Sequence, residues 1–410
     1  MKAKRRVMTA GGPAKRRPTV RKIKPAIAPV VKRPPIDRPR TTGAPPAPGT
    51  SGGSVGSPVG PASASRVVST HDLGSFEATG LDGATASSIE RSVDLSVDLG
   101  RGLVLENPIL VASGTFGYGV EYGDVVDVQR LGAICCKGTT LRPRTGNPTP
   151  RVTETPGGML NSIGLQNPGV DAVVEKYAAT WAGWKVPVIV NVAGESVADY
   201  TEVARRLDGV PGVAGIELNI SCPNVGRGGL QFAIDAGAAG EVTAAVRRAT
   251  DLPLLVKLSP NVADIRPIAR AIADAGADAL TAINTLSGIA VAPGRDRPLL
   301  GNVYGGLSGP AVKPVALKVV YEACQSVDIP VVAIGGVTEL ADVLDFLAVG
   351  AVAVQVGTAI FADPTLPVRL VDQLAAECRA RGLPSYEPLI GTALPRKAGP
   401  PSAKGVEYRP

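Results

Sequence analysis

Histidine is almost absent from this sequence, because its 410 residues include only His71. A folded region without His71 cannot use imidazole as a base or a ligand, and we expect no metal site. Cysteine is also scarce and has no CxxC spacing, which predicts free thiols in a reducing cytosol. No apolar run reaches the roughly 18 residues that a membrane-spanning helix needs, so we expect a cytoplasmic protein. The cysteines lie at positions 135, 136, 222, 324 and 378.

Acidic residues are nearly missing from the first 50 positions, which hold only Asp37 beside fourteen Lys or Arg. This stretch carries +13 and the whole chain +7, so the remainder sums to −6. Residues 1–88 are rich in Pro, Gly, Ala and Ser, and so little apolar surface cannot offset the entropy cost of ordering. We expect a disordered basic extension over 1–88, one folded domain over 89–385 and a tail over 386–410. The basic clusters at 4–6 and 15–17 leave nucleic-acid binding as an alternative function.

From about residue 92, short apolar runs rich in Val and Ile alternate with longer amphipathic segments. Continuous apolar strands followed by helices are typical of a parallel sheet with covered faces. Eight such strands in about 250 residues predict a (β/α)8 TIM barrel of the α/β class. An open doubly wound sheet is the alternative, although no GxGxxG motif follows the first strand. The eight runs are 108–114, 132–138, 187–194, 214–221, 253–260, 277–285, 330–336 and 351–358.

Polar residues or glycines end most of these runs. In a barrel the strand ends face one mouth, where active sites form. A lysine at the end of an apolar strand is costly unless it meets an anion. Lys137 and Lys257 therefore predict an anionic or electron-rich ligand in the mouth, with ion pairs to rim carboxylates as the alternative. The residues at the strand ends are Ser113, Lys137, Asn191, Asn219, Lys257, Asn284, Thr285, Gly335, Gly336, Gly357 and Thr358.

Glycines close the last two runs, as Gly335-Gly336 and as Gly357 before Thr358. Loops after the last two strands of a barrel often bind phosphate, and glycine permits its close approach. A flavin or nicotinamide mononucleotide would fit, covered by the loop at 307–311. The long polar insertion at 139–169 is also expected at the mouth. Its asparagines at 161 and 167 could bind a planar, imide-like ring or simply cap turns.

Cys222 directly follows the fourth run, between Ser221 and Pro223. A free thiol has a pKa of about 8.5, which nearby cations lower, so it can act as a base or a nucleophile. Buried cysteine is often only a small apolar residue, as we expect for the other four. A nucleophile normally needs its own base, and no histidine is available. We therefore favour Cys222 as the base itself.

The folded region resembles dihydroorotate dehydrogenase in seven motifs: NPTPRVTETPGGMLNSIGLQNPG, IELNISCPN, LLVKLSPNVADI, AINTLSG, GGLSGPAVKPVALK, PVVAIGGV and VGTAIF. The resemblance spans about residues 95–370. It implies an FMN-containing catalytic barrel that oxidises (S)-dihydroorotate to orotate in de novo pyrimidine (UMP) biosynthesis. A base takes the proton at carbon 5, and FMN takes hydride from carbon 6. Soluble class 1 members use Cys as the base and membrane-bound class 2 members use Ser, so Cys222 and the lack of an apolar N-terminal anchor indicate class 1.

The resemblance also implies roles for individual residues. Contacts with FMN are expected from Ser113, Lys137, Gly138, Asn191, Asn219, Lys257, Ile283, Gly309, Gly335, Gly336, Gly357 and Thr358. Contacts with the substrate are expected from Lys137, Asn161, Ser162, Ile163, Gly164, Leu165, Asn219, Asn224, Asn284 and Thr285. Lysine and amide donors suit the carboxylate of orotate. Lys257 beside the flavin would stabilise its anionic reduced ring.

Within class 1, the motifs at 147–169 and 305–318 are most similar to the 1B form. That form passes electrons to NAD through a separate subunit that carries FAD and a two-iron two-sulfur cluster. The cysteine spacing of this chain suits no such cluster, so we expect a homodimer core joined to that partner as a heterotetramer. The alternatives are a fumarate-linked 1A enzyme and a related dihydropyrimidine dehydrogenase. The extensions at 1–88 and 386–410 do not belong to the family pattern.

Overall fold

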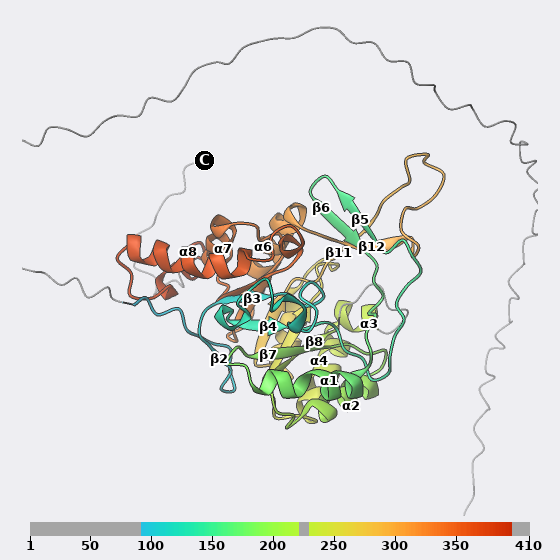
Figure 1. The fold of residues 1–410 in the computed structure, drawn as a ribbon, viewed down its shortest axis with the longest axis horizontal. Coiled ribbons are helices and arrows are strands. Elements are labelled where there is room, and N and C mark those ends of the chain that lie inside the picture. The colour runs from blue at the N-terminus through green and yellow to red at the C-terminus, as the bar shows by residue number, and fades with distance from the viewer. Residues whose placement is uncertain (1–91, 221–228, 396–410) are drawn as a thin grey trace, which may run out of the picture. The chain divides into compact units, whose positions relative to one another are not determined.

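The computed structural model describes residues 92–220 and 229–395, so Cys222, Asn224 and the extension at 1–88 lie outside the described residues. Eight parallel strands close into a barrel in which neighbours follow the order of the chain (Figure 1). This closure confirms the predicted (β/α)8 barrel and excludes the open sheet. The strands are β3 (Ile109–Val111), β4 (Ala133–Cys135), β7 (Val188–Val192), β8 (Val213–Asn219), β9 (Leu254–Leu258), β10 (Ala279–Ala282), β13 (Val331–Ile334) and β14 (Ala353–Val356).

The barrel strands are short, apolar and almost wholly buried, which is what a sheet covered on both faces requires. Every residue of β7 and of β9 is buried. Each of these strands nevertheless contains one strongly polar residue, Asn191 in β7 and Lys257 in β9. The register pairs Asn191 with Glu217 of β8, and Asn219 of β8 with Lys257. The polar residues of three adjacent strands are thereby brought together.

Helices follow the strands and cover the outside of the barrel. The amphipathic segment at 261–278 forms α5 (Arg266–Asp274), which buries Ile268 and Ile272, one turn apart, on a single face. Two short 3-10 turns, Val120–Tyr122 and Val128–Arg130, join β3 to β4. The other α-helices of the described residues are α1 (Val170–Ala182), α2 (Val197–Leu207), α3 (Gly229–Ile234), α4 (Ala236–Arg247), α6 (Lys313–Cys324), α7 (Leu340–Ala348) and α8 (Leu366–Ala380).

A small hairpin lies at the amino-terminal end of the barrel. Its strands are β1 (Val97–Asp98) and β2 (Val104–Leu105), and its turn reaches Asp278, just before β10, through Arg101. The first residues after 385 also pack on the barrel, where Tyr386 donates its hydroxyl hydrogen to the Val352 carbonyl at 2.8 Å. Across the described residues, no helix combines the length and the apolar character needed to cross a membrane.

A second sheet forms part of the mouth, although the sequence indicated only loops there. Its four antiparallel strands are β5 (Val152–Thr155), β6 (Gly158–Asn161), β11 (Leu286–Ile289) and β12 (Tyr304–Ser308), in the order β11-β12-β6-β5. Figure 1 shows this sheet standing beyond the barrel strands. The insertion at 139–169 supplies one half and the excursion after β10 supplies the other. Two distant parts of the chain therefore build one wall of the mouth.

Candidate active site

A cavity of about 670 Å³ opens where the barrel strands end. This volume lies within the range of about 300–1,000 Å³ that is typical of small-molecule sites. Eighteen residues that the sequence predicts as ligand contacts line it: Ser113, Lys137, Gly138, Asn161, Ile163, Gly164, Leu165, Asn191, Asn219, Lys257, Ile283, Asn284, Thr285, Gly309, Gly335, Gly336, Gly357 and Thr358. Of the remaining predicted contacts, Ser162 is fully buried and is not among the lining residues.

Amide side chains form a chain of hydrogen bonds from the rim of the cavity to its floor. Asn284 donates to Asn219 Oδ1 at 3.1 Å, and Asn219 donates to Asn191 Oδ1 at 3.3 Å. Asn191 in turn donates to Glu217 Oε2 at 2.6 Å. Hydrogen-bonded amides of this kind present fixed donors and acceptors without titrating near neutral pH. They are suited to the edges of a planar ring that carries both carbonyl and N–H groups.

Lys257 reaches the floor of the same cavity from β9. Its Nζ donates to Ser113 Oγ at 3.1 Å and lies 3.4 Å from Glu217 Oε2. The sequence left two readings for this lysine, an anionic ligand or an ion pair with a carboxylate at the rim. Lys257 has a carboxylate partner, but that partner is buried inside the barrel, and the lysine still lines the cavity.

Glycines shape the opposite end of the cavity, after β12 and β13. Gly309, Gly335 and Gly336 have φ values of +99°, +131° and +79°, a region that glycine adopts readily and other residues rarely do. A Cβ added at Gly336 would lie 2.7 Å from Lys313 Cβ, at the start of α6. Thr358 donates or accepts a hydrogen bond with Ser308 Oγ at 2.8 Å beside this loop. The backbone is thus held open toward the cavity where a phosphate would approach a helix N-terminus.

The two buried thiols at the end of β4, Cys135 and the following Cys136, do not provide a reactive sulfur. Burial raises the pKa of the Cys136 thiol to about 12 and that of Cys135 well above its ordinary value. Both are therefore neutral near pH 7 and act as small apolar residues, as the sequence predicts. All four cysteines within the described residues are free thiols.

Two buried polar residues of the barrel were not singled out from the sequence. Glu217 and Gln355 are fully buried, and Gln355 donates to Glu217 Oε1 at 3.0 Å. The sequence contained a signal for both, because Glu217 and Gln355 are each flanked by apolar residues within their strands. The side chain of Asn167, by contrast, forms hydrogen bonds within the insertion. Its amide nitrogen donates to Thr140 Oγ1, and its Oδ1 accepts from the backbone N–H groups of Thr140 and Gly169. Asn167 therefore caps turns, which is one of the two roles that the sequence allowed for it.

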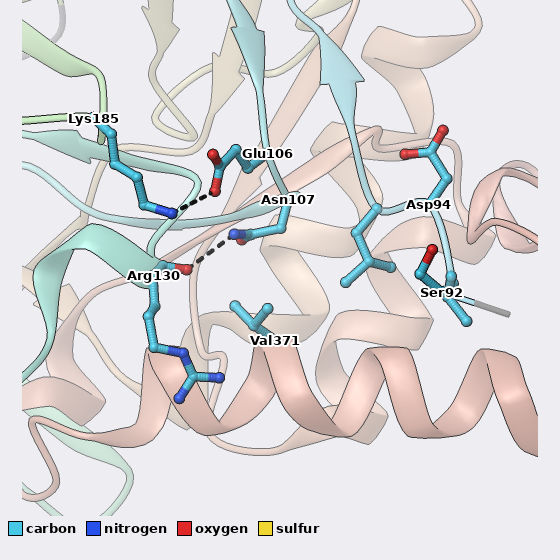
Figure 2. Close-up of a pocket in the computed structure, with 9 residues that line it drawn as sticks. Ser92, Asp94, Glu106, Asn107, Arg130, Lys185 and Val371 are labelled. Atoms are coloured by element: carbon cyan, nitrogen blue, oxygen red, sulfur yellow. Dashed lines mark hydrogen bonds and ion pairs between the residues drawn. The ribbon is translucent and has the colours of Figure 1, made fainter. Parts of the chain in front are cut away.

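A second hollow, of about 520 Å³, lies at the amino-terminal end of the barrel. Figure 2 shows that Lys185 and Glu106 pair there, with 3.0 Å between Nζ and Oε2, and that Asn107 donates to the Arg130 carbonyl. Its lining residues other than Val371 of α8 precede barrel strands or the hairpin, whereas barrel active sites form at the carboxyl ends. Lys185 pairs with Glu106 and Arg130 pairs with Asp372 of α8, so the cavity at the mouth is the candidate active site.

The comparisons with known proteins give a consistent result. A family model described as dihydroorotate dehydrogenase matches residues 97–378. The chain is 51% identical over 298 residues to "Dihydroorotate dehydrogenase B (NAD(+)), catalytic subunit" of Geobacter sp. (strain M21), covering 73% of this chain and 97% of that protein. It is 50% identical over 301 residues to the protein of the same name from Geotalea uraniireducens (strain Rf4), covering 73% and 98%.

A solved structure shares the fold at lower sequence similarity. It is the dihydroorotate dehydrogenase of Eimeria tenella in complex with ferulenol, with a TM-score of 0.62 and 22% identity. The match covers 74% of this chain and 90% of that one. The family model and the relatives at about half identity span almost the whole barrel. This chain therefore belongs to the dihydroorotate dehydrogenase family.

Proposed function

We propose that this chain oxidises (S)-dihydroorotate to orotate in pyrimidine biosynthesis, as the catalytic chain of an NAD-linked, class 1B enzyme. The proposal rests on the cavity at the mouth. Its lining combines the hydrogen-bonded asparagine side chains and two lysines with a group of glycines. The amides and lysines suit a pyrimidine ring with a carboxylate, and the glycines suit a phosphate. The relatives at about half identity bear the name of an NAD(+)-linked catalytic subunit.

The residues at the mouth fit FMN as the cofactor. A phosphate needs backbone donors with no side chain in the way, and the loops at Gly309, Gly335 and Gly336 offer such backbone. A flavin ring needs donors along its polar edge, and Lys257, Ser113 and the amide chain provide them. When bound, FMN supplies the two-electron acceptor that the oxidation requires.

The protein side chains then bind the substrate and move its proton. We assign Lys137 and the amides of Asn161, Asn219 and Asn284 to the carboxylate and imide edges of the pyrimidine, because all four line the cavity. We assign the removal of the proton at carbon 5 to Cys222, with Asn224 beside the substrate. Both assignments for the segment after β8 rest on the sequence motif and on the family, because residues 221–228 lie outside the described ones.

An electron-transfer subunit completes the proposed enzyme. The name of the relatives, a catalytic subunit linked to NAD(+), supports such a separate partner. By the resemblance to the 1B form, that partner carries FAD and a two-iron two-sulfur cluster, and a homodimer of this chain forms the core of a heterotetramer. We place the complex in the cytoplasm, because the cysteine usage favours a reducing compartment.

Mixing the purified chain with dihydroorotate under anaerobic conditions tests the proposal. We expect a yellow protein whose flavin absorbance bleaches on addition of substrate, because electrons cannot leave without an acceptor. Acid release and chromatography of the chromophore would identify FMN. A colourless protein after reconstitution with FMN, or a yellow one that dihydroorotate does not bleach, would contradict the assignment.

Two further substrates separate the alternatives. Rapid reoxidation of the isolated chain by fumarate would indicate a 1A enzyme, whereas a 1B chain should need its partner to reduce NAD. Bleaching by dihydrouracil in preference to dihydroorotate would indicate a dihydropyrimidine dehydrogenase, since dihydrouracil lacks the carboxylate.

Lys137→Met should weaken recognition of the substrate carboxylate. A hydrogen bond to a charged group is worth about 1.5–3 kcal/mol, so we expect KM for dihydroorotate to rise by roughly 10- to 100-fold. The rate with dihydrouracil should fall less, because only the expected contact of Lys137 with FMN is then lost. Lys185→Met is the matched control, because Lys185 pairs with Glu106 at the other end of the barrel. Equal losses with both substrates would contradict a role in carboxylate recognition.

A further inference from the structure

Glu217 is a fully buried carboxylate just beneath the candidate active site. It lies in β8, two residues before Asn219, and has no exposed surface. It is not among the residues that line the cavity, so it cannot contact a ligand there directly. The reaction as proposed above assigns it no role.

Three side chains donate hydrogen bonds to this carboxylate, from three other strands. Asn191 of β7 approaches Oε2 at 2.6 Å, and Lys257 of β9 lies 3.4 Å from the same oxygen. Gln355 of β14 approaches Oε1 at 3.0 Å. Both carboxylate oxygens are therefore satisfied, and one of the partners is a cation that itself lines the cavity.

Glu217 and Lys257 form an ion pair in this part of the barrel. Burial opposes ionisation of Glu217, but the attraction of Lys257 and the hydrogen bonds from Gln355 and Asn191 outweigh it and lower its pKa. The other titratable groups that face the pair are the thiols of Cys135, the last residue of β4, and of Cys136 directly after it, and burial keeps both protonated. Among the described residues, Glu217 is thus the countercharge of Lys257.

A buried ion pair often adds little to folding stability, because apolar residues of similar volume can stabilise a protein equally well or better. Its presence under a ligand cavity therefore invites a functional explanation. An isolated lysine in a dry interior loses its proton as its pKa falls. A lysine held by a buried carboxylate keeps that proton and also keeps its position.

We propose that Glu217 is a positioning residue for the flavin chemistry: it holds Lys257 protonated and in place at the cavity floor, so that the flavin meets a constant positive charge across neutral pH. This inference rests on the proposed function, because it requires a flavin in the cavity. The carboxylate acts through Lys257 and needs no contact with the cofactor or the substrate.

The charge pair itself can be tested without flavin. In Lys257→Met, the buried carboxylate loses its cation and should take up a proton. The infrared C=O band of a protonated carboxylic acid should then appear near neutral pH, in the chain stripped of flavin. The band should be absent from the wild type and from the double variant Lys257→Met/Glu217→Gln. Its absence from Lys257→Met, or its survival in the double variant, would overturn the pairing.

The role toward the flavin is tested by the midpoint potential of the bound flavin between pH 6 and pH 9. In Glu217→Gln, which keeps the shape of the side chain, the positive charge of Lys257 is no longer balanced by the carboxylate and should raise the potential at low pH. At higher pH this buried ammonium, without the Glu217 carboxylate, should release its proton, and the potential should fall toward that of Lys257→Met. This additional pH dependence should vanish in the double variant, which a purely structural role for Glu217 would not predict.

The outcomes separate this inference from the function on which it rests. A Glu217→Gln curve that runs parallel to the wild type across the whole range would overturn the inference alone. A wild-type chain that binds no flavin would overturn the proposed function, and this inference with it. If Glu217→Gln does not fold, Glu217→Asp can replace it, because aspartate keeps the negative charge on a shorter side chain. It should keep the wild-type pH slope, and an altered slope would count against the proposal.

Discussion

Replacing Cys222 by alanine should reduce turnover of dihydroorotate by about 10²- to 10⁴-fold at neutral pH, the range by which a positioned base accelerates proton transfer. Flavin should remain bound, because none of the residues assigned to it changes. Steady-state rates, together with the flavin absorbance of the same preparation, measure both effects. Cys324→Ala is the matched control, because Cys324 ends α6 and should tolerate the change with near-normal turnover.

Cys222→Ser distinguishes a base from a merely structural cysteine. A hydroxyl loses its proton far less readily than a thiol, so the variant should keep slight activity that rises toward higher pH. A pH profile of kcat for the wild type and the serine variant would show this displacement. Wild-type rates in Cys222→Ala, or identical profiles in wild type and Cys222→Ser, would exclude the thiol as the base.

Gly336→Ala should cause a large loss of flavin binding. The new Cβ would lie 2.7 Å from Lys313 Cβ and 3.1 Å from the Gly309 carbonyl oxygen, so the loop and the start of α6 must move apart. Lys313 resists that movement, because its Nζ pairs with Asp342 and Asp345 at 2.5 and 2.6 Å. A displacement that costs the complex about 1.4 kcal/mol already weakens binding tenfold, and we expect at least roughly that effect.

Gly209→Ala provides the control for this substitution. Gly209 also has a positive φ, +69°, but an added Cβ would meet nothing within 4 Å. It follows α2, away from the cavity lining, and alanine there should cost only the backbone strain of about 1–2 kcal/mol in stability. Titration with FMN and thermal unfolding of both variants separate the two effects. Equal flavin affinity in both variants would contradict the phosphate assignment of the glycine loop.

The barrel was predictable from the sequence because each strand is a continuous apolar run and each helix has a clear apolar face. All eight runs form barrel strands, and the polar residues at their ends, such as Lys257 and Asn284, meet in one cavity. The sheet at the mouth was not predictable in the same way. Strands such as β5 and β12 are short and partly exposed, and they alternate or contain glycines, so they carry no continuous apolar signal.

The partners of buried polar groups were equally hard to predict. Lys257 was predicted to need an anion, but the sequence does not show which carboxylate lies beside it. Glu217 is 40 positions away in sequence and becomes its neighbour only through the register of β8 and β9. Gln355 reaches the same carboxylate from β14, 138 positions away. Such contacts depend on closure of the barrel, which local pattern does not encode.

The mixed origin of the sheet at the mouth has a consequence for the ribosome-bound chain. Asn161 in β6 is held opposite Gly306 in β12, a residue made 145 positions later. During synthesis β6 can pair with β5, but its other edge stays unpaired until translation has passed β12. Tight capture of the pyrimidine should therefore be impossible for any nascent fragment ending before that point, however well its first strands have already assembled.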